Sequence, residues 1–93
     1  MAEYIGVSIG RNVGETPMSA SRWAQFRAEV AALGDLQAVK VGTAEWEGVR
    51  EDSATLELLV DDLDAIRPEL AAIAAKYDQD AVGLWQAELI NRS

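Results

Sequence analysis

Neither cysteine nor histidine occurs in the 93-residue sequence. Without cysteine the chain has no disulfide bond, no thiol nucleophile and no thiolate metal ligand. Without histidine it has no imidazole general base, no Ser-His-Asp triad and no histidine-bearing zinc site. Only carboxylate, tyrosine, arginine, lysine and backbone groups remain for catalysis. We therefore predict that the protein is not an enzyme, has no catalytic residues, and uses neither a metal nor a cofactor.

Basic side chains are also scarce. Eight lysine and arginine residues stand against sixteen aspartate and glutamate residues, which gives a net charge of −8. Nucleic acids are bound mainly through basic side chains that neutralise phosphates, so this balance argues against a nucleic-acid partner, and equally against an anionic membrane surface. Two interpretations of the acidic surface remain: it keeps the protein in solution, or it attracts a basic protein partner.

Long apolar runs are missing as well. Stretches such as residues 71–75 are far shorter than the ~20 residues that span a bilayer. The N-terminal Met1-Ala2-Glu3 is acidic and leads directly into a predicted strand, which predicts a cytoplasmic protein without a signal peptide. Apolar residues make up 49% of the sequence and charged residues 26%, as in ordinary globular domains. We predict a single domain over residues 1–93.

Hydrophobic periodicity predicts the order of the secondary-structure elements. Apolar residues that alternate with polar or small ones predict strands at residues 4–10, 36–46, 54–60 and 81–90. Apolar residues spaced by three and four predict helices at residues 19–33 and 61–77. Ser19 or Ser21 is expected to cap the first helix, and Pro68 either kinks the second helix or begins it. Residues 11–18 are predicted as a loop, and residues 47–52 as the polar connection of an antiparallel hairpin.

The resulting order is β-α-β-β-α-β, the split βαβ pattern. It predicts an α+β domain of the ferredoxin-like kind, with two helices packed on one face of a four-stranded antiparallel sheet. The order itself carries almost no information about function.

The sheet face opposite the helices is the first candidate surface. Tyr4 and Leu59 are assigned to it because they alternate with core-facing neighbours. Either the odd-numbered or the even-numbered residues of the last strand can face outward, and Gln86 favours the even-numbered set, which includes Leu84. Trp46 joins the set because it ends a strand beside charged residues. An apolar face of this kind is scattered and half-buried, or closes a homodimer, or binds a different protein.

Two further groups are candidate contacts for a partner or ligand. Arg11, Asn12 and Arg22 flank the predicted start of the first helix, where a small anion or ligand can be held. Four carboxylates cluster around the hairpin: Glu45, Glu47, Glu51 and Asp52. They are interpreted as a solvated turn, or as the acidic tip to which a basic partner binds.

Two other patterns are interpreted as structural. Gly6, Gly10 and Gly14 match neither a dinucleotide fingerprint nor a Walker A box, so they are turn glycines. The aspartates at 61, 62 and 64 suit the start of a helix. They lack the alternating ligands, glycine and distal glutamate of a calcium loop.

Two stretches resemble an uncharacterised family of small proteins of unknown function from actinobacteria and other bacteria. One is Gly10-Arg11, a loop, and then Ser19-Ala20-Ser21-Arg22-Trp23-Ala24-Gln25-Phe26; the other is Ala75-Lys76-Tyr77-Asp78-Gln79-Asp80-Ala81-Val82. The resemblance covers the topology of most of the chain, although the connection after Leu33 is shorter here. The alanine-rich, lysine-poor composition is similar to that of a GC-rich actinobacterium or of its phages. The family implies no activity for any residue.

The leading hypothesis is a non-catalytic protein-interaction module, bacterial or phage-encoded, that binds a host protein or a second copy of itself as a homodimer. The alternative is a small-molecule-binding dimer or cofactor-free enzyme with a pocket between the sheet and the helices. In that alternative the side chains of Tyr4, Arg11, Asn12 and Trp23 would contact the ligand.

Overall fold

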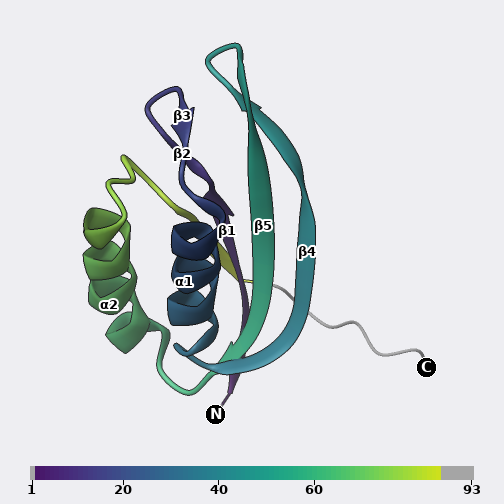
Figure 1. Cartoon of the computed structure of the whole chain (residues 1–93). Coiled ribbons are helices and arrows are strands. Elements are labelled where there is room, and N and C mark those ends of the chain that lie inside the picture. The colour runs from purple at the N-terminus through teal and green to yellow at the C-terminus, as the bar shows by residue number, and fades with distance from the viewer. Residues whose placement is uncertain (1, 87–93) are drawn as a thin grey trace, which may run out of the picture.

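The computed structural model describes residues 2–86, apart from the side chain of Trp46. One antiparallel sheet is built from β1 (Glu3–Gly10), β4 (Asp35–Trp46), β5 (Val49–Val60) and β6 (Gly83–Gln86), in the order β4-β5-β1-β6. Helices α1 (Ala20–Ala31) and α2 (Leu63–Lys76) both lie on one face of it (Figure 1). The prediction of an α+β domain with two helices and a four-stranded antiparallel sheet is confirmed. Neither helix in this part of the chain is long and apolar enough to cross a membrane.

The helix starts follow from their caps. Ser19 is the N-cap of α1, and its hydroxyl accepts a hydrogen bond from the Arg22 N–H at 3.2 Å. Asp62 caps α2 by accepting bonds from the backbone N–H groups of Asp64 and Ala65. The helix therefore begins before Pro68 and runs through it.

The β4–β5 connection is shorter than predicted. Only Glu47 and Gly48 lie outside the strands, and both have positive φ, 50° and 81°. Such a two-residue turn matches the right-handed twist of the flanking strands. The prediction of a polar connection over residues 47–52 is wrong, because the polar residues after Val49 continue the ladder opposite β4.

The predicted loop at residues 11–18 also contains regular pairing. β2 (Asn12–Val13) and β3 (Thr16–Pro17) form a small hairpin, and Gly14 in its turn has a φ of 62°. The Met18 N–H donates to the Arg11 carbonyl at 2.9 Å and closes the hairpin. Strands of two residues are too short to show any periodicity, so the pattern could not reveal them.

The hydrophobic core fills the space between the sheet and the helices. The sheet contributes Ile5, Val7, Ile9, Ala54, Leu56, Leu58 and Val60, and the rest of the buried cluster includes Met18, Trp23, Phe26, Val30, Leu63, Ile66, Leu70 and Tyr77. The Phe26 ring stacks on Tyr77 at 4.7 Å between centroids and meets Trp23 edge-on at 5.9 Å. Trp23, one of the side chains predicted to contact a ligand, belongs to this core cluster. A groove of about 410 Å³ does lie between α2 and the segment that enters β6, but the four side chains predicted to contact a ligand do not line it.

A polar clamp joins the C-terminal end of α2 to α1. The Glu29 carboxylate accepts hydrogen bonds from the Lys76 ammonium, at 2.8 Å, and from the Tyr77 hydroxyl. The Arg22 guanidinium donates to the Lys76 carbonyl at 2.8 Å and lies 4.8 Å from the centroid of the Tyr77 ring. The hydrogen bonds from Lys76 and then Tyr77 lower the pKa of Glu29.

The clamp makes stability depend on pH. A carboxyl whose pKa is lowered by folding stabilises the protein above the ordinary glutamate range, and this contribution is lost as the pH falls through the lowered pKa. We expect Glu29→Gln to lower the urea midpoint near neutral pH and the difference from the wild type to vanish in acid. Tryptophan fluorescence over a pH series measures both midpoints. Glu69→Gln on the exposed side of α2 controls for the lost charge, and a Glu29→Gln effect that is constant with pH would contradict the assignment.

Candidate carboxylate-lined cavity

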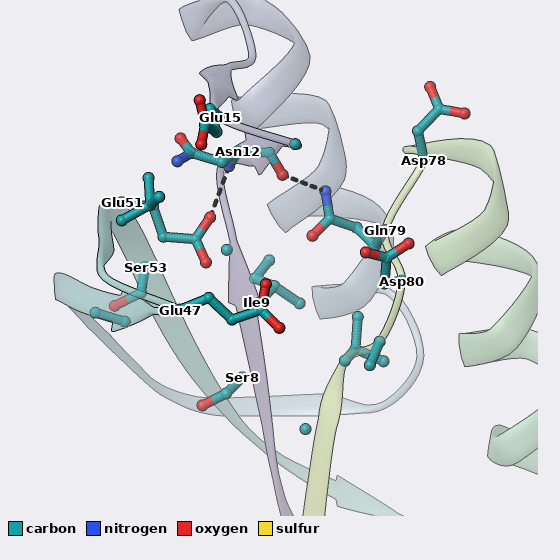
Figure 2. Close-up of a pocket in the computed structure, with 17 residues that line it drawn as sticks. Ser8, Ile9, Asn12, Glu15, Glu47, Glu51, Ser53, Asp78, Gln79 and Asp80 are labelled. Carbon is teal, nitrogen blue, oxygen red and sulfur yellow. Dashed lines mark hydrogen bonds between the residues drawn. The ribbon is translucent and has the colours of Figure 1, made fainter.

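A cavity of about 640 Å³ lies at the end of the sheet where three segments meet. They are the β4–β5 turn, the β2–β3 hairpin and the segment that joins α2 to β6 (Figure 2). The strand register brings these three segments together. The end of β1 pairs with the start of β5 and, at Ser8, with the start of β6 at Gly83. The cavity therefore depends on segments far apart in the sequence.

Carboxylates dominate the polar lining. The five acidic residues at the cavity are Glu15, Glu47, Glu51, Asp78 and Asp80, and within residues 2–86 no lysine or arginine lines it. Glu47 and Glu51 extend from the hairpin side and Asp80 from the opposite side, whereas Asp78 points away from them (Figure 2). Among the described residues no group of three or more carboxylates converges closely enough to hold a metal ion.

Asn12 braces the cavity wall. Its backbone N–H donates to the Glu51 carboxylate at 2.8 Å, and its carbonyl accepts from the Gln79 amide at 3.0 Å (Figure 2). These bonds tie the β2–β3 hairpin to the β4–β5 hairpin on one side and to the α2–β6 segment on the other. Glu15, Glu47 and Asp80 have neither a hydrogen bond nor an ion pair from their side chains within residues 2–86. Their charges face the solvent-filled space.

The predicted acidic tip is divided by the structure. Glu47 and Glu51 line the cavity, but Asp52 forms an ion pair with Arg11 at 3.0 Å, and Glu45 lies in β4 opposite Arg50. Neighbouring residues of a strand point to opposite faces, so four carboxylates near one hairpin cannot form a single cluster. The sequence analysis missed Glu15, Asp78 and Asp80. The β-α-β-β-α-β order could have revealed them, because it brings the segment after the first strand and the segment after the second helix to the same end of the sheet as the β4–β5 turn.

The predicted anion site is not assembled. The Arg11 side chain donates to the Met18 carbonyl at 2.7 Å and pairs with Asp52, so its guanidinium group holds the β2–β3 hairpin. The Arg22 guanidinium belongs to the α1–α2 clamp. Asn12 lies at the cavity instead. The three residues are close in sequence, but their side chains are engaged by different parts of the fold.

The open sheet face is more polar than predicted. The Tyr4 hydroxyl donates to Glu57 at 2.6 Å, and the Lys40 ammonium contacts the same carboxylate at 2.8 Å. The hydrogen bond to the Glu57 carboxylate raises the pKa of Tyr4, and the Lys40 bond followed by the Tyr4 bond lowers the pKa of Glu57. Leu59 pairs with Tyr4 and is half-buried on this face, as predicted.

The orientation predicted for the last strand is wrong. Leu84 pairs with Val7 and packs against the core, whereas Trp85 pairs with Gly6 on the open face and is 45% exposed. The prediction relied on the polarity of Gln86, which lies on the helix side of the edge strand β6 but remains exposed. Its side-chain amide donates to the Glu3 carboxylate at 2.9 Å. Trp46 ends β4, but its side chain lies outside the described part, as do residues 87–90 of the predicted strand.

The described residues therefore form a cavity rich in carboxylates and an open sheet face on which polar contacts join Tyr4, Glu57 and Lys40 while Trp85 remains partly exposed. The resemblance to the actinobacterial family remains a prediction that rests on the two sequence stretches. Comparisons with protein-family models, with curated proteins and with solved structures find no match for this chain.

Proposed function

We propose that the protein is a non-catalytic module that binds another protein, and that the partner presents a basic segment to the carboxylate-lined cavity. The observation that carries this proposal is the lining itself, in which the described part of the chain places five carboxylates and no basic side chain around about 640 Å³. The net charge of −8 would steer a basic partner towards the molecule. Lysine and arginine side chains would then pair with Glu15, Glu47 and Asp80.

The finer classification of the fold and its setting belong to the same proposal. We propose that the domain is of the ferredoxin-like kind. The order β4-β5-β1-β6 supports this, since each helix connects two strands that have one other strand between them. A cytoplasmic protein of an actinobacterium or its phage remains our expectation, supported by the composition alone.

A small cationic molecule is the second candidate occupant. Ligand pockets commonly have volumes of about 300–1,000 Å³, and the cavity lies within that range at about 640 Å³. A polyamine such as spermine carries amines along a flexible chain and matches carboxylates placed around a space. This hypothesis keeps the notion of a ligand-binding protein but moves the site from the helix–sheet interface to the end of the sheet.

Removing the unpaired carboxylates tests the proposal. We expect the wild type to bind a lysine-rich peptide in isothermal titration calorimetry, more weakly as salt is added. The variant Glu15→Gln, Glu47→Gln, Asp80→Asn should lose about tenfold in affinity, since three exposed pairs at roughly 0.5 kcal/mol each amount to that factor. The matched variant Asp35→Asn, Asp61→Asn, Glu69→Gln removes the same charge from elsewhere and should bind within about twofold of the wild type.

Each outcome has a distinct meaning. Equal losses in both triple variants would show only long-range attraction and would overturn the cavity as the binding site. Binding of spermine but not of the peptide would replace the protein partner by the small cation. Circular dichroism of all variants verifies that the loss is not due to unfolding.

A further inference from the structure

Strand β4 carries an exposed apolar stripe. Leu36, Val39 and Val41 are 44%, 46% and 72% exposed. They pair with Leu58, Leu56 and Ala54 of β5, which are buried under the helices, so the stripe lies on the helix side of the sheet. The helices do not extend over β4, which is the outermost strand on the side away from α2 (Figure 1). The apolar face of the sheet therefore continues past the core into solvent.

The same strand has an unprotected edge. β4 is twelve residues long, and only β5 pairs with it among the described residues. Natural edge strands are usually short, or interrupted by proline, inward-pointing charges or bulges, because their free N–H and C=O groups attract another strand. β4 has no proline, and the Lys40 ammonium is occupied by Glu57 on the other face. Its one irregularity, at Gln37, lies near the start and leaves the ladder from Ala38 onward regular.

The local charge indicates which molecule covers this edge. Residues 36–44 contain no acidic residue, although the whole chain has sixteen. Two copies with a net charge of −8 each repel one another where their carboxylates come close. Contact through residues 36–44 brings no carboxylates of this stretch together. A basic partner would find no carboxylate here to bind, and would meet Lys40. The edge thus suits a second copy of the chain better than the basic segment assigned to the cavity.

We propose that two copies associate through their β4 edges, antiparallel and about a two-fold axis at Val41. The two four-stranded sheets then form one continuous sheet, and the two apolar stripes lie side by side on its helix side. In this register Val41 lies opposite the partner's Val41 and Val39 opposite the partner's Thr43. Lys40 lies opposite the partner's Gly42, so no like charges face each other directly.

Neighbouring registers are less favourable. An axis at Lys40 would place two lysines directly opposite one another, and an axis at Gly42 would place Val39 opposite the partner's Glu45. The regular part of β4 centred on Val41, residues 38–44, gives a ladder of about seven residues that is about 24 Å long. Its contact area is at the small end of specific interfaces, so we expect a reversible dimer of micromolar affinity. This surface is separate from the cavity residues that carry the proposed function.

The lack of native cysteine allows a direct test of the register. Directly opposite residues in an antiparallel pair have Cα atoms about 4.5–5.5 Å apart, which is within disulfide range. Val41→Cys should therefore form a covalent dimer under mild oxidation on a non-reducing gel. Thr43→Cys, whose expected neighbour is the partner's Val39, and Val13→Cys in β2 should remain mostly monomeric. Equal crosslinking of all three, or none for Val41→Cys, would overturn the proposed pairing.

A charge reversal of the contact gives an independent readout. We expect sedimentation equilibrium to show a monomer–dimer equilibrium for the wild type and at least a tenfold weaker dimer for Val41→Lys, which places two ammonium groups face to face. Val13→Lys makes the same change at a site 37% exposed elsewhere and should behave as the wild type does. Val41 is 72% exposed, so at concentrations low enough for the wild type to be monomeric its variant should keep the wild-type urea midpoint. A wild type that stays monomeric at millimolar concentration would refute the dimer.

Discussion

Replacing Phe26 by alanine is expected to bring the protein close to global unfolding. The Phe26 side chain is fully buried, with its ring stacked on Tyr77 at 4.7 Å and meeting Trp23 edge-on at 5.9 Å. Truncation removes the transfer free energy of the ring and leaves a void beside two aromatic side chains that cannot both move into it. Such substitutions cost about 3–5 kcal/mol. A domain of this length has about 5–14 kcal/mol in total.

Urea unfolding followed by circular dichroism measures this loss. The midpoint should fall sharply for Phe26→Ala, and the thermal midpoint should fall by roughly 12–30 °C. Gln25→Ala changes the neighbouring exposed position of α1 and should lie within about 0.5 kcal/mol of the wild type. A Phe26→Ala effect no larger than that of the control would mean that the aromatic cluster does not hold α1 to the rest of the fold.

Gly34 is expected to be the most sensitive glycine. A Cβ at this position, in the connection between α1 and β4, would lie 2.6 Å from the Leu59 carbonyl oxygen and 2.7 Å from a methyl carbon of Val60. The carbonyl belongs to the backbone of β5 and cannot move alone, so the α1–β4 connection must shift away from the sheet. We expect Gly34→Val to cost about 1–3 kcal/mol, the usual range for overpacking.

Gly42 provides the matched control. It lies in β4, and a Cβ added there meets nothing within 4 Å. Valine is favoured in strands, so Gly42→Val should leave the urea midpoint unchanged or raise it slightly. The same substitution thus tests close approach at one site and open space at the other. Similar losses at both glycines would contradict the backbone contact at Leu59.

The predicted elements succeeded where a long segment had one buried face. Ile5, Val7 and Ile9 alternate because β1 is buried on its helix side, and the spacing of Trp23, Phe26 and Val30 follows the core-facing stripe of α1. The prediction for the orientation of the last strand was wrong because β6 is a short edge strand, and the helices do not cover all of its helix-side positions. At such positions polarity no longer reports the direction of a side chain.

The residues that line the cavity could be predicted only in part from the sequence. Glu47 and Glu51 were named from their closeness in sequence, but Glu15 and Asp80 join them only through the pairing of β1 with both β5 and β6. Charge patterns along a chain describe neighbours, whereas a binding site is made by segments that the topology brings together. The exposed stripe on β4 could not be predicted from the sequence either. Val39 and Val41 have the pattern of a buried strand, and only the placement of the helices leaves them uncovered.

The central place of β1 in the sheet has a consequence for biosynthesis. β1 occupies an inner position, with Glu3 paired to Val60 on one side and Ile5 to Gln86 on the other. A ribosome must therefore finish residue 86 before the first strand can acquire its second neighbour. Until then the apolar side of β1 has no complete site in which to be buried. Pairings so distant in sequence slow folding, so the sheet cannot be completed until residues 83–86 have been synthesised and can reach β1.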